Sequence, residues 1–335
     1  MISKAHLRNY EIALITTTEA LNHPNYDLHL AHLEQQFTTH LIPNADVKTI
    51  SRLTQSLRTD IMVLPDGDAF VWKEAWKLRQ KRHGSVSAVV MRPNSSGKGS
   101  IKPFIIELIK RLLLTLANMQ PDVIAVPLKS SLWTSQNNQI GVPDPVSFHP
   151  DRHAPSMIET AIASNPDRKW LGILGALSAR KNIDLVLRSA RIVDRSDFGI
   201  VLAGHMEPAV AEKIQDKLYE TRKKGIEIIV CNTFLTDGEL DAILQKLHCV
   251  VLAHSNEGPS GILGKAVEAG TFILAAGAKS LREDCRLLPE SSHWSPLNEQ
   301  DLADAIDVAL TYPTPIPKQL NTGAIFSESL LQQKG

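Results

Sequence analysis

The stretch Leu171-Gly-Ile-Leu-Gly-Ala-Leu-Ser-Ala-Arg-Lys-Asn-Ile-Asp184 decides the fold, because it contains a buried strand, a short polar loop and the start of a helix. The apolar run predicts a strand that ends near Gly175, and the next helical pattern begins near Asn182. The loop between them carries Arg180 and Lys181. Free N–H groups and the helix dipole attract anions, so two cations at this place predict a phosphate site. The alternative is a solvated Arg-Lys pair in an ordinary strand-to-helix loop.

A second stretch, His254-Ser-Asn-Glu-Gly-Pro-Ser-Gly-Ile-Leu-Gly-Lys-Ala-Val-Glu-Ala-Gly-Thr271, has a similar organisation. It follows an apolar run, and its turn Gly258-Pro-Ser-Gly261 precedes a helical pattern. Glycines let backbone amides approach an anion closely, and Ser260 adds a hydroxyl donor. The alternative is that Ser260 caps the helix and the glycines only turn the chain.

Apolar runs of strand length alternate with helical patterns along most of the chain, which is typical of parallel α/β sheets. We predict strands over residues 12–15, 61–64, 86–91, 123–126, 171–174, 200–203, 226–230, 250–253 and 272–275. Three prolines within residues 142–150 block helix and central strand, which places a domain boundary near residue 155. We therefore expect two doubly wound α/β domains that face a central cleft, residues 1–155 and 156–312. Residues 313–335 begin with three spaced prolines and are expected to return toward the first domain.

Composition narrows the class of protein. The chain has 335 residues with 36 basic and 36 acidic side chains, so its net charge does not favour binding to nucleic acid. Cys231, Cys249 and Cys285 stand at unrelated spacings, which indicates buried thiols in a reducing compartment. No cluster of residues has metal-ligand spacing, and no bound cofactor is expected. The sequence lacks a targeting segment, which predicts a cytoplasmic protein.

From about Val142 to Ala276 the chain resembles the nucleotide-sugar-binding domain of GT-B fold glycosyltransferases, of the retaining family 4 type. The resemblance rests on the 142–146 junction, Gly175 to Lys181, Leu202-Ala-Gly204, the polar segment 232–239, Glu257-Gly-Pro-Ser-Gly-Ile-Leu263 and Glu268-Ala-Gly-Thr-Phe-Ile-Leu274. Residues 1–155 match only in outline, as the α/β domain that would hold the acceptor.

Two positions depart from the family pattern. Ala176 stands where the family has an arginine, so one of two phosphate-binding cations is missing, and Arg180 could compensate. Lys265 stands eight positions after Glu257, where the family has a carboxylate that holds the donor ribose. Lys265 could donate to ribose oxygens, pair with Glu257 or Glu268, or add charge near the diphosphate. It could also extend to solvent.

The resemblance implies a metal-independent, retaining hexosyltransferase that moves a sugar from a nucleotide diphosphate to a hydroxyl acceptor. Lys181 and Arg180 would stabilise the leaving diphosphate, and Glu257 would contact the transferred sugar. The donor would also be bound by Gly175, Gly258, Ser260, Gly261, Ile262, Lys265, Asn232 and Phe234. The missing family ligands leave a second hypothesis open, a non-catalytic subunit that binds a partner glycosyltransferase or a glycan. A third hypothesis is an epimerase that acts on the nucleotide sugar itself.

The amino-terminal half offers Asp66, Asp68 and Arg92 as acceptor-binding residues, because each follows a predicted strand. The alternative for the Asp-Gly-Asp segment is an ordinary turn. The apolar helix predicted over 104–119 is interrupted or preceded by Lys98, Lys102, Lys110 and Arg111. It is either a core helix with a basic edge or a contact with the inner face of a membrane. The acceptor would be a glycan, a lipid-linked sugar or a protein.

Overall fold

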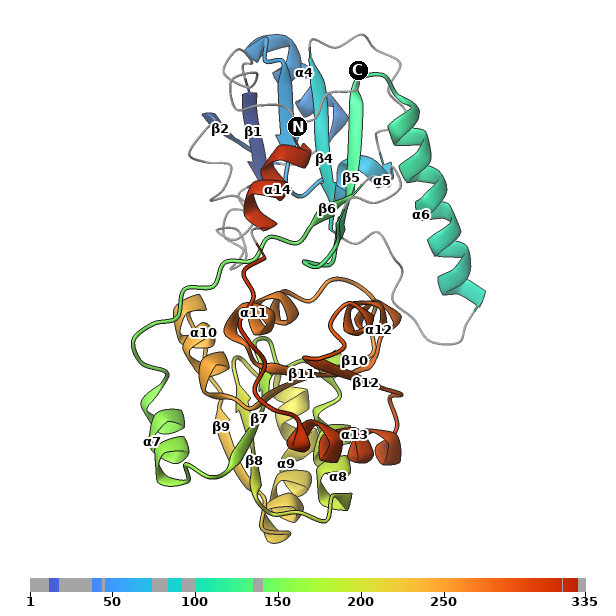
Figure 1. Ribbon diagram of the computed structural model, residues 1–335. Coiled ribbons are helices and arrows are strands. Elements are labelled where there is room, and N and C mark those ends of the chain that lie inside the picture. Colours follow the sequence, from blue (N-terminus) through green and yellow to red (C-terminus); the bar gives the residue numbers. More distant parts are fainter. Residues whose placement is uncertain are drawn as a thin grey trace. The chain divides into compact units, whose positions relative to one another are not determined.

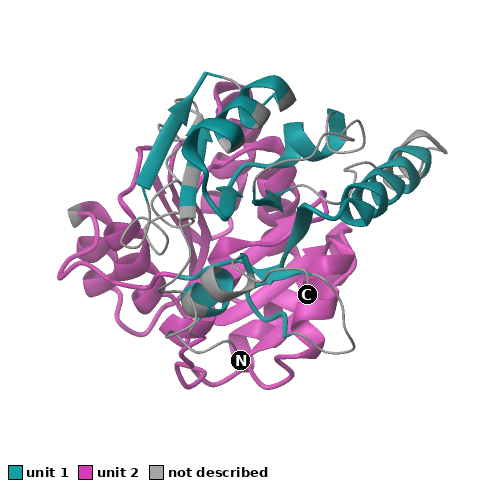
Figure 2. Cartoon of the chain, turned by 90° about the horizontal axis from the view of Figure 1, so that it is seen from above, with its two compact units in different colours: residues 1–146, 321–335 teal, residues 147–320 magenta. Residues whose placement is uncertain are grey.

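The computed structural model describes residues 12–17, 38–43, 46–73, 84–91, 101–134, 141–320 and 322–330. The chain forms two compact units, unit 1 with residues 1–146 and 321–335, and unit 2 with residues 147–320 (Figure 2). Within the described residues each unit contains one parallel six-stranded sheet.

The strands of unit 2 follow the order β12-β11-β10-β7-β8-β9. They are β7 (Lys169–Leu174), β8 (Phe198–Ala203), β9 (Glu227–Cys231), β10 (Cys249–His254), β11 (Phe272–Gly277) and β12 (Ser292–Ser295). Counted from β7 this is the order 3-2-1-4-5-6 of a doubly wound sheet, whose direction of winding reverses between β7 and β10. The loops after these two strands therefore lie at the switch point, where ligands of such sheets bind.

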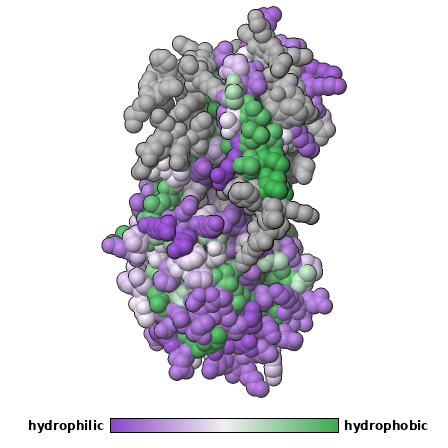
Figure 3. All heavy atoms as spheres, turned by 90° about the vertical axis from the view of Figure 1, so that its right-hand side faces the viewer, coloured by the Kyte–Doolittle hydropathy of each residue, from purple (hydrophilic) through white to green (hydrophobic). Residues whose placement is uncertain are grey.

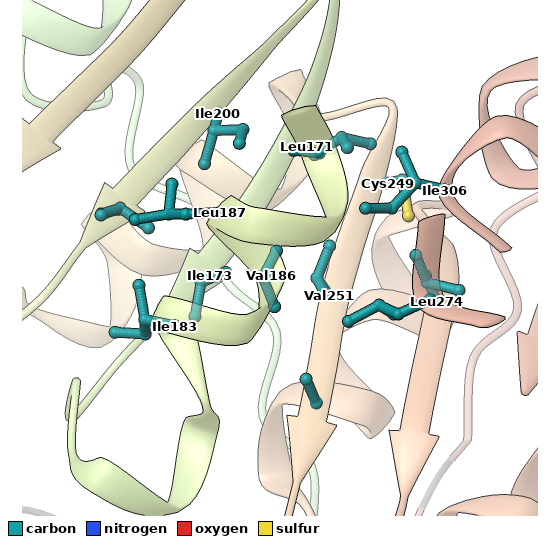
Figure 4. Close-up of a cluster of buried hydrophobic side chains, with 14 of the residues drawn as sticks. Leu171, Ile173, Ile183, Val186, Leu187, Ile200, Cys249, Val251, Leu274 and Ile306 are labelled. Atoms are coloured by element: carbon teal, nitrogen blue, oxygen red, sulfur yellow. The ribbon is translucent and has the colours of Figure 1, made fainter. Parts of the chain in front are cut away.

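Helices cover both faces of this sheet (Figure 1). They are α7 (Ser156–Ser164), α8 (Ile183–Ile192), α9 (Pro208–Lys223), α10 (Asp237–Lys246), α11 (Gly261–Ala269), α12 (Lys279–Arg286) and α13 (Glu299–Thr311). Ile173, Val186, Val251 and Leu274 point toward one another from β7, α8, β10 and β11 (Figure 4). This dry core fixes the strand ends from which the polar loops start.

The sheet of unit 1 has the order β2-β1-β3-β4-β5-β6. Its strands are β1 (Ile12–Thr17), β2 (Thr38–Ile42), β3 (Ile61–Leu64), β4 (Ser85–Val90), β5 (Val123–Lys129) and β6 (Val142–Pro143). Helices α4 (Val47–Leu57), α5 (Asp68–Lys73) and α6 (Ile101–Met119) contribute to the core on one face. On the other face Phe326 and Leu330 of α14 (Thr322–Leu330) are buried, and α14 contacts β6 and β4. The last described helix of the chain thus completes the core of unit 1.

Hydrogen bonds explain why unit 2 extends beyond the interval 156–312. At its start, Ser147 accepts a bond from Lys265 and the His149 N–H donates to Asp241. At its end, the Lys318 N–H donates to the Val267 carbonyl and the Leu320 N–H to Glu268. Both flanking segments are therefore fastened to α10 and α11, and the structure divides the chain at 146/147 and 320/321.

One face of α6 is apolar and exposed. Ile105, Leu108, Ile109 and Leu112, which are spaced to share a helix face, are between 47 and 61% exposed. Figure 3 shows a hydrophobic patch on this side of unit 1. The outward face of the helix is thus not consumed by the sheet, in contrast to a core helix. No helix in the described part of the chain is long and apolar enough to cross a membrane.

Candidate functional site

The loops after β7 and β10 are joined at the switch point of unit 2. Gly175, at φ +83°, turns the chain out of β7, and the short 3-10 helix η2 (Ala179–Lys181) follows. The Ser255 N–H donates to the Arg180 carbonyl at 3.0 Å, and Asn182 Nδ2 donates to the Ala253 carbonyl at 2.8 Å. The two stretches that the sequence singled out are therefore neighbours in the fold.

Lys181 is the buried cation of this loop, with only 5% of its surface exposed. Its Nζ donates to the Leu174 carbonyl and lies 3.5 Å from the place where a Cβ on Gly175 would stand. Burial, reinforced by the Arg180 charge, lowers the pKa of Lys181 to about 7. Within the described residues no carboxylate lies within 4 Å of its Nζ. A buried ammonium without a counter-ion is costly, and an anionic ligand would remove that cost.

Helix α11 begins next to this ammonium. Gly258, at φ +137°, and Ser260, buried at the N-cap position, lead into the helix, and the Ser260 side chain makes no capping hydrogen bond. The Cδ1 atom of Ile262, in the first turn, lies 3.9 Å from the Cβ position of Gly175. The structure thus brings Gly175, Lys181 and the first turn of α11 together. A helix N-terminus facing a buried cation suits a phosphate group.

Glu257 is held at the start of another helix. Its two carboxylate oxygens accept from the Lys279 and Ser280 N–H groups, each at 3.0 Å, at the N-terminus of α12. The Ser280 hydroxyl also donates to the Gly258 carbonyl at 3.1 Å. The expected contact of Glu257 with a sugar would therefore use the remaining lone pairs of a carboxylate that already caps α12.

Lys265 makes contacts that the sequence did not anticipate. It is 4% exposed, and its Nζ donates to Asp241 Oδ1 and to the Ser147 carbonyl, both at 2.7 Å. The solvent-exposed alternative is wrong, and the ammonium pairs with Asp241 rather than with either glutamate. Burial raises the pKa of Asp241, and the Lys265 hydrogen bond opposes that rise. Two of the three N–H donors of Lys265 are thus used inside unit 2.

The loops after β8 and β9 carry a stacked aromatic pair. Phe234 is 74% exposed, and its ring stacks on His205 with centroids 4.4 Å apart and an interplanar angle of 6°. Asn232 Oδ1 accepts from the Met206 N–H at 2.9 Å, which joins the two loops. His205 was not predicted from the sequence, where its only signal was its place directly after the predicted strand 200–203 and Gly204.

The candidate acceptor residues lie in unit 1. Asp68 Oδ2 accepts from the Met91 N–H at 2.8 Å and Oδ1 accepts from Trp72 Nε1 at 3.0 Å. Asp68 therefore connects the residue after β4 to α5, while Asp66 is exposed. Arg92 lies outside the described residues. Among the described residues no group of three or more His, Cys, Asp or Glu could hold a metal ion.

No protein-family profile matches this chain. No curated protein matches it in sequence either. Solved structures do match: sucrose-phosphate synthase from Thermosynechococcus elongatus has a TM-score of 0.61 at 13% identity, with 96% of each chain covered. Anabaena HepE in complex with UDP and glucose has a TM-score of 0.57 at 12% identity, covering 96% of this chain and 94% of HepE. S. aureus MnaA with UDP has a TM-score of 0.56 at 14% identity, covering 96% and 91%.

At these identities the likeness establishes the fold. The chain has the α/β GT-B fold of glycosyltransferases, with two doubly wound units. The expected fold class, α/β with two doubly wound parallel sheets, is confirmed.

Proposed function

We propose that this protein is a glycosyltransferase that moves a sugar from a nucleotide-diphosphate sugar to a hydroxyl acceptor. The observation that carries the proposal is Lys181, a buried ammonium at the switch point with no carboxylate beside it in the described structure. The similar structures of HepE and MnaA that hold UDP support a nucleotide diphosphate as its anion.

The chemistry follows from the charge that develops on the leaving group. As the bond between the sugar and the diphosphate breaks, negative charge grows on the phosphate oxygens. Lys181, Arg180 and the first N–H groups of α11 would stabilise that charge. Because these donors are fixed before the reaction, the leaving diphosphate would not need a metal ion. The resemblance to family 4 glycosyltransferases implies that the transfer is of the retaining type. Glu257 would face the transferred sugar, and the exposed face of Phe234 would stack on the base.

In this proposal the acceptor binds to unit 1. Asp66 follows β3, beside the switch point between β1 and β3, and would bind acceptor hydroxyls. The exposed apolar face of α6 supports a lipid-linked acceptor at an anionic membrane surface. Residues 92–119 carry five basic side chains, Arg92, Lys98, Lys102, Lys110 and Arg111, against the single acid Glu107, in a chain without net charge. Such a cationic and apolar segment is complementary to anionic lipid.

A second candidate function is a non-catalytic subunit with this fold. It is favoured by Lys265, because the ammonium is committed to Asp241 and cannot accept hydrogen bonds from ribose hydroxyls. Such a subunit would bind a nucleotide or a partner glycosyltransferase without transferring sugar.

A thermal-shift screen against nucleotides and nucleotide sugars tests the proposal, because a ligand that binds only the folded state stabilises it. We expect a nucleoside diphosphate and one of its sugars to raise the melting temperature. Turnover of that sugar, as transfer or slow hydrolysis, should fall by about 10²-fold or more in Lys181→Met. The matched control is Lys213→Met, which removes an exposed lysine of α9. Nucleotide binding without any turnover would favour the non-catalytic subunit.

A further inference from the structure

His254, the last residue of β10, contains a buried nitrogen without a hydrogen bond. The side chain is 6% exposed, and within the described structure its Nε2 atom has no hydrogen-bond partner. In the unfolded chain such a ring nitrogen is hydrogen-bonded to water. If it is buried on folding without a new partner, the folded state is less stable. Such an atom therefore points to a ligand that satisfies it when bound.

His254 lies at the edge of the anion site. Side chains alternate along a strand, and Cys249, Val251 and Ala253 belong to the core shared with α8 and α13. His254 is thus on the other face of the sheet. Its two chain neighbours, Ala253 and Ser255, are hydrogen-bonded to the loop that carries Arg180 and Lys181.

Burial and nearby positive charges keep the imidazole ring of His254 neutral. Burial and the charges of Lys181 and Arg180 lower the pKa of His254 to about 3. A neutral imidazole has one N–H donor and one acceptor nitrogen. Beside two cations it adds a donor for an anion without adding a third positive charge.

We propose that His254 is a binding residue of the diphosphate site, with Nε2–H donating to a phosphate oxygen beside the ammonium of Lys181. The inference rests on the proposed function. It adds to the diphosphate site a residue other than the two cations and the N-terminus of α11. The ligand class is a diphosphate ester, and inorganic pyrophosphate presents the same oxygens without base or sugar.

The experiment compares His254→Gln with His254→Leu. The glutamine amide nitrogen stands close to the position of Nε2 and retains the donor, whereas leucine fills the space without one. Calorimetric titration with UDP and with pyrophosphate should give affinities within about threefold of the parent for the glutamine variant. The leucine variant should lose about tenfold or more toward both probes. Without ligand it should melt at the same or a higher temperature, because it removes an unsatisfied buried nitrogen.

His248→Leu is the matched control. His248 lies directly before β10, and its ring Nε2 is 3.0 Å from the Ala309 carbonyl, so this variant should lose stability and keep its affinity. A leucine variant at 254 that binds both probes like the parent would overturn the inference and leave the proposed function intact. Loss of ligand-free stability in both 254 variants would also overturn it, since it would indicate a packing role. A parent protein that binds neither pyrophosphate nor any of UDP, ADP and GDP would overturn the proposed function and the inference together.

Discussion

The ammonium of Lys265 and the carboxylate of Asp241 lie 2.7 Å apart, with 5% and 1% of their side-chain surfaces exposed. Each partner also holds the segment that enters unit 2, Lys265 through the Ser147 carbonyl and Asp241 through the His149 N–H at 2.8 Å. The pair thus connects α10, α11 and the first residues of the unit.

Breaking this pair should destabilise unit 2. Lys265→Met leaves the buried Asp241 charge without a counter-ion, so we expect a loss of about 3–5 kcal/mol in the free energy of unfolding. The double variant Lys265→Met with Asp241→Leu should recover much of that loss, because no buried charge remains. Urea denaturation of the single and double variants measures both effects. Equal stability of Lys265→Met and the parent would show that the pair does not stabilise unit 2.

The depressed pKa of Lys181, about 7, predicts a pH dependence. In the unfolded chain the amine stays protonated to about pH 10.4, so between pH 7 and 10 the unfolded state holds more protons. The ligand-free protein should therefore gain stability from Lys181 as the pH rises through that window. Binding a diphosphate favours the charged amine, so affinity should fall above pH 7, by up to about tenfold per pH unit. Titrations from pH 6.5 to 9 should show this slope in the parent, and a similar slope in Lys181→Met would contradict its assignment to Lys181.

From the stacked pair of His205 and Phe234 we predict a contribution to nucleotide affinity that depends on the presence of the nucleotide base. Phe234→Ala removes an exposed ring and should weaken UDP binding by about fivefold to a hundredfold. It should leave pyrophosphate binding unchanged, because pyrophosphate has no base. Parallel calorimetric titrations with UDP and with pyrophosphate measure both affinities. Equal losses of affinity for the two ligands would show that Phe234 acts on the anion site instead of on the base.

The α6 face predicts binding to anionic vesicles. Replacing Leu108 and Leu112 by glutamate puts charge into the apolar stripe, so co-sedimentation with vesicles containing phosphatidylglycerol should fall at least tenfold. The control changes Tyr219→Glu, an exposed aromatic residue of α9 in unit 2. Undiminished sedimentation of the double variant would exclude this face as the lipid contact.

Much of the fold was predictable, because buried parallel strands are apolar runs. The predicted strand over 200–203 lies within β8, whose residues are all buried. By contrast β2, Thr38–Ile42, was missed since its first residues are exposed and polar. β12 was missed because its sequence Ser292-His-Trp-Ser295 has no apolar run. The sequence also predicts helices over 28–37 and 71–80, but residues 28–37 and 74–80 lie outside the described residues.

The site was predictable only as separate loops. Strand ends with glycine and cations indicated where Gly175, Lys181 and Ser260 would lie, since parallel strands place such loops at one edge. The partner of Lys265 was not predictable, because Asp241 occupies a helix position that nothing distinguishes from a surface acid. The absence of a hydrogen bond at His254 Nε2 was not predictable either, because it depends on packing by elements distant in sequence.

The central claim is that unit 2 binds a nucleoside diphosphate through Lys181. Calorimetric titration of the parent and of Lys181→Met with UDP, ADP and GDP tests it most directly. We predict that at least one of these binds the parent and loses about tenfold to a hundredfold in affinity in Lys181→Met, with Lys213→Met unchanged. Equal affinity of the parent and Lys181→Met, or no binding of any of the three at millimolar concentration, would contradict the claim.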